Sequence, residues 1–153
     1  MKTKKSKKDY FIEVSHLKKS YGFLKAVDDI SFTVKKGALF AFLGVNGAGK
    51  STTINIISST LSKDSGEIKI DSLDLDKDNA KVKEKIGIVF QNSVLDSLLT
   101  VRENLTIRAR FYRLNKNAIN RSIERVSKIL NLYPILDQEV GKLSGGQKRR
   151  VDI

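Results

Sequence analysis

The sequence predicts an α/β fold in which antiparallel strands come first, a strand–loop–helix unit follows, and the last third is helical. Apolar and polar residues alternate at 30–34 and again at 68–70, as in strands with one exposed face. Continuous apolar runs at 38–43 and 86–90 are typical of strands that are buried on both faces. Beyond residue 100 the spacing of apolar residues becomes helical.

The composition is that of a folded chain of about one domain. The 153 residues are 40% hydrophobic and 30% charged, which argues against disorder over most of the length. With no Cys and one His, the sequence excludes a disulfide scaffold, thiolate metal sites and a multi-His metal centre. No apolar run approaches the roughly 20 residues of a membrane span, and we therefore expect a soluble chain.

The net charge is +12, from 29 Lys and Arg against 17 Asp and Glu. Five lysines lie within residues 1–9, and the remaining +7 (12 − 5) is spread along the chain. This balance suits nucleic acid, an anionic membrane or phosphate ligands. We expect residues 1–9 to form a basic disordered tail, with a weak contact to anionic lipid or RNA as the alternative.

The first elements surround a glycine-rich turn. The strand over 30–34 ends in the turn at 35–37, and the buried strand over 38–43 follows. The turn at 44–49 then leads into a helix over about 50–61. A strand, a glycine-rich loop and a helix in this order form one supersecondary unit.

Two capping-box patterns predict helix N-termini in the last third. Thr100 and Glu103 form T-x-x-E, and Ser144 and Gln147 form S-x-x-Q. Between them a helix that ends before Pro134 is predicted by apolar residues at helical spacing, namely Ile119, Ile123, Val126 and Leu130.

Residues 44–51 match the phosphate-loop pattern G-x-x-x-x-G-K-[ST]. The glycines let successive N–H groups face a phosphate, and the N-terminus of the following helix adds positive charge. Lys50 would reach the β and γ phosphates, and the Ser51 hydroxyl would bind Mg²⁺. The pattern predicts a purine-nucleotide site made by Gly44, Val45, Asn46, Gly47, Ala48, Gly49, Lys50 and Ser51.

A second motif, Leu-Ser-Gly-Gly-Gln, occupies residues 143–147. Two consecutive glycines in the first turn of a helix cost roughly 1 kcal/mol each relative to Ala. That cost is tolerable where the bare N–H groups must approach a ligand. The motif therefore predicts a second anion-binding helix terminus at Ser144, Gly145, Gly146 and Gln147.

With both motifs present, the chain resembles the nucleotide-binding domain of the ABC (ATP-binding cassette) proteins, a P-loop NTPase fold, over residues 10–153. Residues 44–51 with Thr52 resemble its Walker A loop, and 143–147 resemble its signature, 94 residues further on (144 − 50). The resemblance implies that Gln91 positions water and Mg²⁺ and that Tyr21 stacks on adenine. Residues 98–105 and 148–153 resemble the drug-export, ABC-2 type subgroup more than the importers.

The resemblance implies an ATP-binding subunit of an exporter, with ATP and Mg²⁺ as cofactors, that couples ATP hydrolysis to transport. Two such domains, identical or different, would enclose ATP, each signature acting on the nucleotide that its partner holds. The subunit would be cytoplasmic, peripheral on the inner face of the membrane, and bound to transmembrane permease subunits, with no specific nucleic acid. The implied organisation is an ATP-binding core and antiparallel β subdomain at 10–91, an α-helical subdomain at 92–143, and the signature with the start of a helix at 144–153.

The resemblance also sets expectations for the region after the signature. The sequence stops six residues after Gln147 (153 − 147), before the family's Walker B strand, catalytic Glu and switch His. We expect the C-terminal part of the parallel sheet to be missing and the strands ending at Leu43 and Phe90 not to pair with each other. We also expect these 153 residues to bind ATP without hydrolysing it.

Two other classes of protein are alternatives. A soluble ABC protein that acts on the ribosome or nucleic acid is favoured by the net charge of +12. A P-loop GTPase or kinase is disfavoured by the complete signature. A neighbouring gene for a six-span membrane protein would indicate a transporter.

Overall fold

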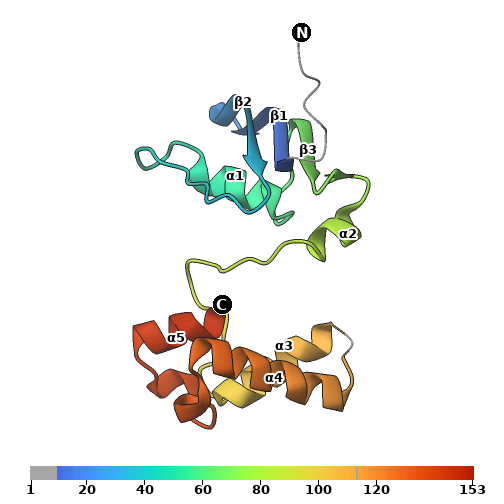
Figure 1. Ribbon diagram of the computed structural model, residues 1–153. Coiled ribbons are helices and arrows are strands. Elements are labelled where there is room, and N and C mark those ends of the chain that lie inside the picture. Colours follow the sequence, from blue (N-terminus) through green and yellow to red (C-terminus); the bar gives the residue numbers. More distant parts are fainter. Residues whose placement is uncertain (1–9, 113) are drawn as a thin grey trace. The chain divides into compact units, whose positions relative to one another are not determined.

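The computed structural model describes residues 10–112 and 114–153, so the basic tail predicted at 1–9 lies outside the described residues. The chain divides into two compact units, one up to Gly87 and one from Ile88 onward. Figure 1 shows that strands dominate the first unit and that the second is helical.

The first unit is built on a four-stranded antiparallel sheet with the strand order β2-β1-β3-β4. The alternation predicted in the second strand is confirmed, since Val34 is buried and Ser31 and Thr33 are exposed. The isoleucines predicted to face inward in the third strand, Ile68 and Ile70, are both buried. The strands are β1 (Tyr10–Tyr21), β2 (Leu24–Lys35), β3 (Ser65–Ile70) and β4 (Leu73–Asp74).

Helices α1 (Lys50–Ile57) and α2 (Asn79–Lys83) pack on this sheet. Their contribution to its apolar core is Ile56 from α1 and Val82 from α2. The rest of the core comes mainly from the sheet and consists of Val14, Leu17, Val27, Ile68, Ile70 and Leu75.

Helix α1 begins at the predicted residue but ends at Ile57 instead of residue 61. The hydroxyls of Ser58 and Thr60 both donate to the carbonyl oxygen of Asn55, each at 3.0 Å. Ser and Thr hydroxyls that bond to nearby backbone carbonyls compete with helix continuation. These two side chains therefore close the helix one turn early.

The two buried strands predicted at 38–43 and 86–90 are absent, which corrects the sequence-based expectation. Both segments are irregular and mostly exposed, with Leu39 100% and Leu43 91% accessible. A central strand needs a neighbour for its N–H and C=O groups. The sheet formed by the described residues contains only β1 to β4, so neither segment has such a neighbour.

Aromatic packing attaches the segment 38–43 to β2. The ring of Phe40 stacks on Phe32 of β2 at a centroid distance of 5.3 Å, and Phe42 meets Phe32 edge to face at 5.1 Å. Phe40 and Phe42 also contact each other at 5.2 Å. Such pairs add to apolar burial, so β2 fixes the chain just before the glycine-rich turn.

The second unit contains the helices α3 (Val101–Phe111), α4 (Lys116–Leu130) and α5 (Gly145–Asp152). Both predicted capping boxes are confirmed, at the N-termini of α3 and α5. Two residues of the predicted stripe on α4, Ile119 and Ile123, are buried in the core of this unit. Among the described residues, every helix is too short or too polar to cross a bilayer.

A side chain from α5 closes the C-terminal end of α4. The guanidinium of Arg150 donates to the carbonyl oxygens of Leu130 and Asn131 at 3.3 and 3.2 Å. The last carbonyls of a helix lack intrahelical partners and carry partial negative charge. Arg150 therefore satisfies the end of α4 and connects it to the helix that carries the Leu-Ser-Gly-Gly-Gln motif.

Candidate nucleotide-binding site

The glycine-rich turn at 44–49 has the backbone conformation that the phosphate-loop pattern requires. Gly47 and Gly49 have φ values of 85° and 74°, in the left-handed region that residues with a Cβ avoid. Gly49 is the N-cap of α1, and a Cβ on it would overlap the carbonyl oxygen of Ala26 in β2. Glycine at position 49 therefore allows the N-terminus of α1 to approach β2 closely.

Lys50 folds back over this turn. Its ammonium group donates to the carbonyl oxygens of Gly44 and Val45 at 2.8 and 2.6 Å. Lys50 is also the first residue of α1, where N–H groups of the first turn lack intrahelical partners. A full positive charge and the positive end of a helix are thus concentrated on one turn, which favours an anion with several oxygens.

The three hydroxyl residues after Lys50 differ in their surroundings. Thr53 is buried, and its hydroxyl donates to the Gly49 carbonyl oxygen at 2.9 Å, so its role is structural. Ser51 is exposed and Thr52 is half-buried. Exposure leaves the Ser51 hydroxyl open to a ligand.

The donor set here fits magnesium only together with a phosphate ligand. Among the described residues no group of three or more His, Cys, Asp or Glu side chains could hold a metal ion. Magnesium prefers oxygen ligands and is commonly bound through one or two protein oxygens plus phosphates and water. The Ser51 hydroxyl at the end of a phosphate-binding turn supplies one such oxygen.

Tyr21 lies at the same end of the β1–β2 hairpin as this turn. It pairs with Leu24 across the hairpin, and Ala26, which Gly49 approaches, comes two residues later in β2. Two residues of a strand span about 7 Å. Tyr21 is 50% exposed. The structure therefore brings together two parts of the predicted site, the aromatic ring and the phosphate turn.

The remaining predicted site residues belong to the second unit. Gln91 is exposed in an irregular segment, and the carbonyl oxygen of the preceding Phe90 accepts a hydrogen bond from Arg149 of α5. This bond links the segment of Gln91 to the helix of the second motif.

The second motif presents bare backbone at the N-terminus of α5. The Ser144 hydroxyl accepts from the Gln147 N–H at 3.3 Å, and the Gln147 side-chain oxygen accepts from the Ser144 N–H at 2.8 Å. A Cβ at Gly145 or Gly146 would meet no atom within 4 Å. Packing within this chain therefore does not require glycine at either position, whereas close approach of a ligand would.

Sequence reasoning missed a charged group beside Tyr21. The ammonium of Lys19 lies 5.7 Å from the centroid of the Tyr21 ring, and it donates to Asp64 at 2.9 Å. Lys19 and Asp64 are 45 residues apart, so no local pattern in the sequence indicates the pair.

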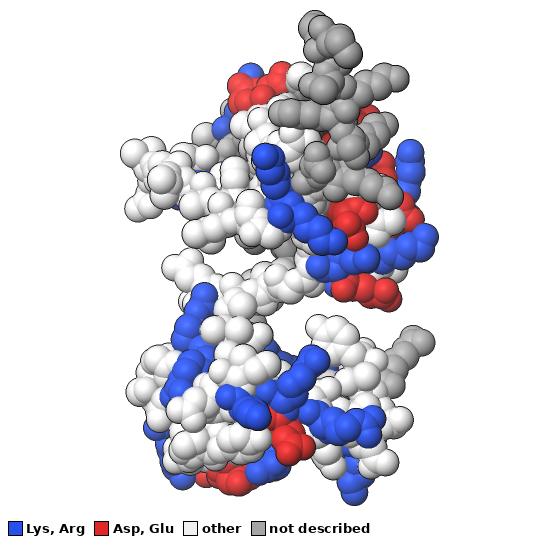
Figure 2. Space-filling model, in the orientation of Figure 1, with Lys and Arg blue, Asp and Glu red and all other residues white. Residues whose placement is uncertain are grey.

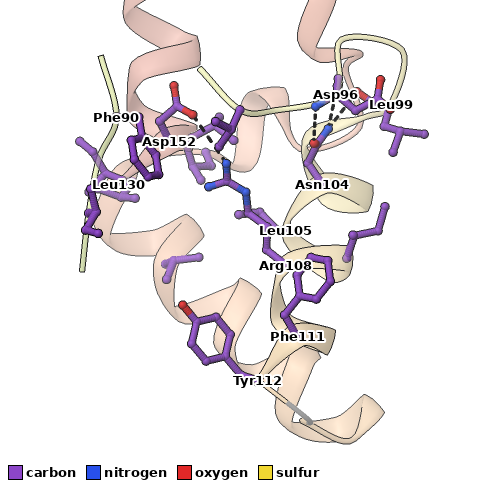
Figure 3. Close-up of a pocket in the computed structure, with 17 residues that line it drawn as sticks. Phe90, Asp96, Leu99, Asn104, Leu105, Arg108, Phe111, Tyr112, Leu130 and Asp152 are labelled. Carbon is purple, nitrogen blue, oxygen red and sulfur yellow. Dashed lines mark hydrogen bonds and ion pairs between the residues drawn. The ribbon is translucent and has the colours of Figure 1, made fainter. Parts of the chain in front are cut away.

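Sequence reasoning also missed a largely apolar cavity of about 670 Å³ in the second unit. Figure 3 shows Arg108 of α3 pointing toward Asp152 of α5 in this cavity, with Phe111 at the end of α3 and Tyr112 directly after it. The Arg108 guanidinium lies 3.8 Å from the Asp152 carboxylate, which also accepts from the Ser93 hydroxyl at 3.0 Å. These contacts join α3, α5 and the segment that follows Gln91.

The positive charge of the chain is dispersed on the face that Figure 2 shows. Lysine and arginine side chains occur on each unit, with acidic side chains among them. Several cations of the described residues are paired with carboxylates, including Lys63 with Asp76 at 2.6 Å and Arg102 with Asp137 at 2.7 Å. Basic side chains that are interspersed with acidic ones differ from the clustered basic patch that indicates nucleic-acid binding.

Comparison with known proteins identifies the family. Residues 27–153 match the family model described as ABC transporter. The chain belongs to the ABC transporter family. This ABC transporter chain is 39% identical over 142 residues to the linearmycin resistance ATP-binding protein LnrL of Bacillus subtilis (strain 168), covering 93% of this chain and 46% of LnrL. It is 34% identical over 142 residues to the sulfate/thiosulfate import ATP-binding protein CysA of Synechococcus elongatus, covering 93% and 41%.

A solved structure agrees with this assignment. The cbiO1 protein from Clostridium perfringens, described as part of the ABC transporter complex cbiONQ, superposes with a TM-score of 0.83 at 31% identity. The match covers 94% of this chain and 59% of cbiO1. The α/β P-loop NTPase fold predicted from the sequence is confirmed, and the chain spans about half the length of the curated relatives it matches.

Proposed function

We propose that this ABC family chain is part of the ATP-binding subunit of an exporter, in which ATP binding and hydrolysis drive substrate transport across a membrane. The observation that carries the proposal is the turn at 44–49, on which the Lys50 ammonium and the N-terminus of α1 converge. The complete Leu-Ser-Gly-Gly-Gln motif at the N-terminus of α5 supports an ABC ATPase over other P-loop proteins.

In this proposal the triphosphate lies in the turn, and Lys50 exchanges its backbone acceptors for phosphate oxygens. The ammonium leaves the carbonyl oxygens of Gly44 and Val45 and donates to phosphate oxygens, which are stronger acceptors because they are charged. Magnesium, held at Ser51 together with phosphate oxygens, would neutralise part of the phosphate charge. The adenine would stack on the exposed ring of Tyr21.

The motif at 144–147 has a different role in the proposal. It acts on the nucleotide of a second nucleotide-binding domain, and the partner's motif acts on the nucleotide held here. The exposed and sterically open Gly145 and Gly146 support a ligand that arrives from outside the chain. The proposed organisation is a nucleotide-binding part at 10–91, a helical part at 92–143, and the motif with its helix at 144–153.

The proposed direction of transport is export. The sequences at 98–105 and 148–153 support this direction. Transmembrane permease subunits are the proposed partners, and the chain would act at the cytoplasmic face of their membrane.

The proposal is tested by the Lys50→Ala variant. Removing the ammonium eliminates charge-assisted bonds worth roughly 1.5–3 kcal/mol, so the Kd for a fluorescent ATP analogue should rise about 10- to 100-fold. The matched control is Lys36→Ala, which removes an exposed lysine from the turn after β2 and should leave the Kd unchanged. Equal affinity of Lys50→Ala and the parent would refute the phosphate-binding assignment.

A further inference from the structure

The ring of Tyr21 has a cation on one side. Lys19 and Tyr21 are separated by one residue at the end of β1, where the pairing with β2 is irregular. The ammonium of Lys19 lies 5.7 Å from the ring centroid, within the range of a cation–π contact. The side chain of Lys19 is only 12% exposed, whereas Tyr21 is 50% exposed. Lys19 is thus packed under a ring that remains open to solvent.

Asp64 fixes this lysine and the end of β1 from a distant part of the sequence. One carboxylate oxygen of Asp64 accepts from the Lys19 ammonium at 2.9 Å, and the other accepts from the Ser20 N–H at 2.6 Å. The N–H of Asp64 in turn donates to the Lys18 carbonyl oxygen at 3.0 Å. Three consecutive residues of β1 are therefore bound by one aspartate immediately before Tyr21.

The charge state of Asp64 suits this role. The hydrogen bond from Lys19, followed by the backbone N–H of Ser20, holds the pKa of the Asp64 carboxyl below its usual range. The group is ionised at neutral pH and accepts both hydrogen bonds.

We propose that Lys19 and Asp64 are positioning residues for the nucleotide base: they hold the Tyr21 ring so that one face meets the Lys19 ammonium and the opposite face receives adenine. An aromatic face is electron-rich, and a cation on one side draws electron density toward itself. The opposite face then becomes a better stacking platform for an electron-rich purine. This inference rests on the proposed nucleotide site. Within that site it assigns the residues that position the base.

The position of the ring relative to the phosphate turn supports this assignment. Tyr21 pairs with Leu24 at the end of the hairpin, and Gly49 abuts Ala26 two residues further along β2. The phosphates and the base are at opposite ends of a nucleotide. The turn and the ring can therefore hold different ends of one ligand, and their contributions can be measured separately.

The test compares the affinities of the 153-residue chain for ATP and for inorganic tripolyphosphate, measured by calorimetry. Tripolyphosphate has no base, so the ratio of the two affinities reports the base contact alone. In Lys19→Met, which is similar in length but neutral, ATP affinity should fall about two- to fivefold with tripolyphosphate affinity unchanged. In Lys19→Arg, which keeps the cation and can still bond to Asp64, the ratio should stay near that of the parent.

Lys63→Met is the matched control. Lys63 is 14% exposed and pairs with Asp76 at 2.6 Å, so it resembles Lys19 in burial and pairing but contacts no aromatic ring among the described residues. Its substitution should leave the ratio unchanged. A fall of the ratio in Lys63→Met equal to that in Lys19→Met would overturn the proposal, because general loss of an ion pair would then explain both.

A second measurement does not depend on the stability of Lys19→Met. The sequence contains no Trp, so Tyr21→Trp introduces the only tryptophan, whose emission can be excited selectively over that of the remaining tyrosines. ATP should quench its emission by stacking, and tripolyphosphate should not. Adding Asp64→Asn, which leaves an acceptor for the Ser20 N–H but removes the charge, should raise the ATP concentration needed for half-maximal quenching. No rise would overturn the role of Asp64.

Two further variants separate this inference from the proposed function. If Lys50→Ala leaves both affinities unchanged, the phosphate site itself is wrong. If Lys50→Ala lowers both, while Tyr21→Ala lowers the ratio and Lys19→Met does not, the nucleotide site holds and only the support by Lys19 fails. Tyr21→Ala should lower the ratio about 5- to 150-fold, the range of base–aromatic stacking. An unchanged ratio in Tyr21→Ala would overturn both the stacking of adenine on Tyr21 and the positioning of that ring by Lys19 and Asp64.

Discussion

At the scale of single residues, the site depends on backbone conformations that favour glycine. Gly47 and Gly49 both have positive φ, but their surroundings differ. A Cβ on Gly47 would meet no atom within 4 Å, whereas a Cβ on Gly49 would overlap the backbone of Ala26. The first glycine satisfies a conformational requirement, and the second also satisfies a steric one.

Alanine substitutions should separate these two requirements. Gly47→Ala is expected to lower the free energy of unfolding by about 1–2 kcal/mol, the cost of a left-handed residue with a Cβ. Gly49→Ala should cost more and should also weaken ATP binding, because α1 must move away from β2. Urea denaturation and calorimetric titration check both values. Equal losses of stability in the two variants would contradict the close approach of Gly49 to Ala26.

Charged residues at this scale differ in how far along the sequence their partners lie. Lys50 contacts carbonyls only five and six residues away, and the phosphate-loop pattern predicted its place in the turn. Lys19 depends on Asp64, 45 residues further on. Local motifs therefore identified the cation on the glycine-rich turn and missed the pair beside Tyr21, whose contact exists only after β1 and β3 have paired.

At the scale of elements, the N-terminus of α3 is stabilised by a carboxylate in its charged form. The Glu103 carboxylate accepts from the Thr100 N–H at 2.8 Å and from the Thr100 hydroxyl at 2.7 Å. These bonds, the backbone bond first, hold the pKa of Glu103 below its usual range. A carboxyl whose pKa is lower in the folded state stabilises that state above its unfolded pKa, about 4.3 for Glu.

The contribution of Glu103 should therefore depend on pH in a defined direction. It is fully present above about pH 4.3 and is lost as the pH falls through the lower pKa of the folded state. We expect Glu103→Gln to lower the urea midpoint at pH 7 and to lower it less at about pH 2.5. The control Glu124→Gln, at an exposed position in α4, should show no such convergence. A Glu103→Gln effect of the same size at both pH values would refute this role.

The elements also show why some predictions from the sequence succeeded and others failed. The capping boxes at Thr100 and Ser144 are local chemistry, complete within four residues, and both were predicted correctly. The alternation in β2 was correct because it reflects one buried face. The strands predicted from the apolar runs at 38–43 and 86–90 were wrong. A continuous apolar run indicates a preference for burial, but it contains no information about which strand would be its neighbour.

At the scale of the whole molecule, the net charge of +12 should act on an anionic ligand at a distance. The Debye length falls from about 10 Å at 0.1 M salt to 3 Å at 1 M. The Kd for ATP should rise about three- to tenfold between 0.05 and 0.5 M NaCl. Adenosine, which is uncharged, serves as the control, and its Kd should change little. The same rise for both ligands would show that salt acts on the protein and not on attraction between charges.

The contact between Arg150 and the end of α4 has a consequence for how the second unit opens. Fraying of the last turn of α4 would move away both carbonyl acceptors, at Leu130 and Asn131, and leave the guanidinium without them. Local opening of α4 and α5 is therefore coupled, because the two hydrogen bonds from Arg150 break whether the end of α4 or the part of α5 around Arg150 detaches. Amide hydrogens in the last turn of α4 and in α5 would then exchange with deuterium at a common rate, as members of one cooperative unit. The order of the Ser-Gly-Gly segment at the start of α5 would then depend partly on α4, to which Arg150 of α5 is bonded.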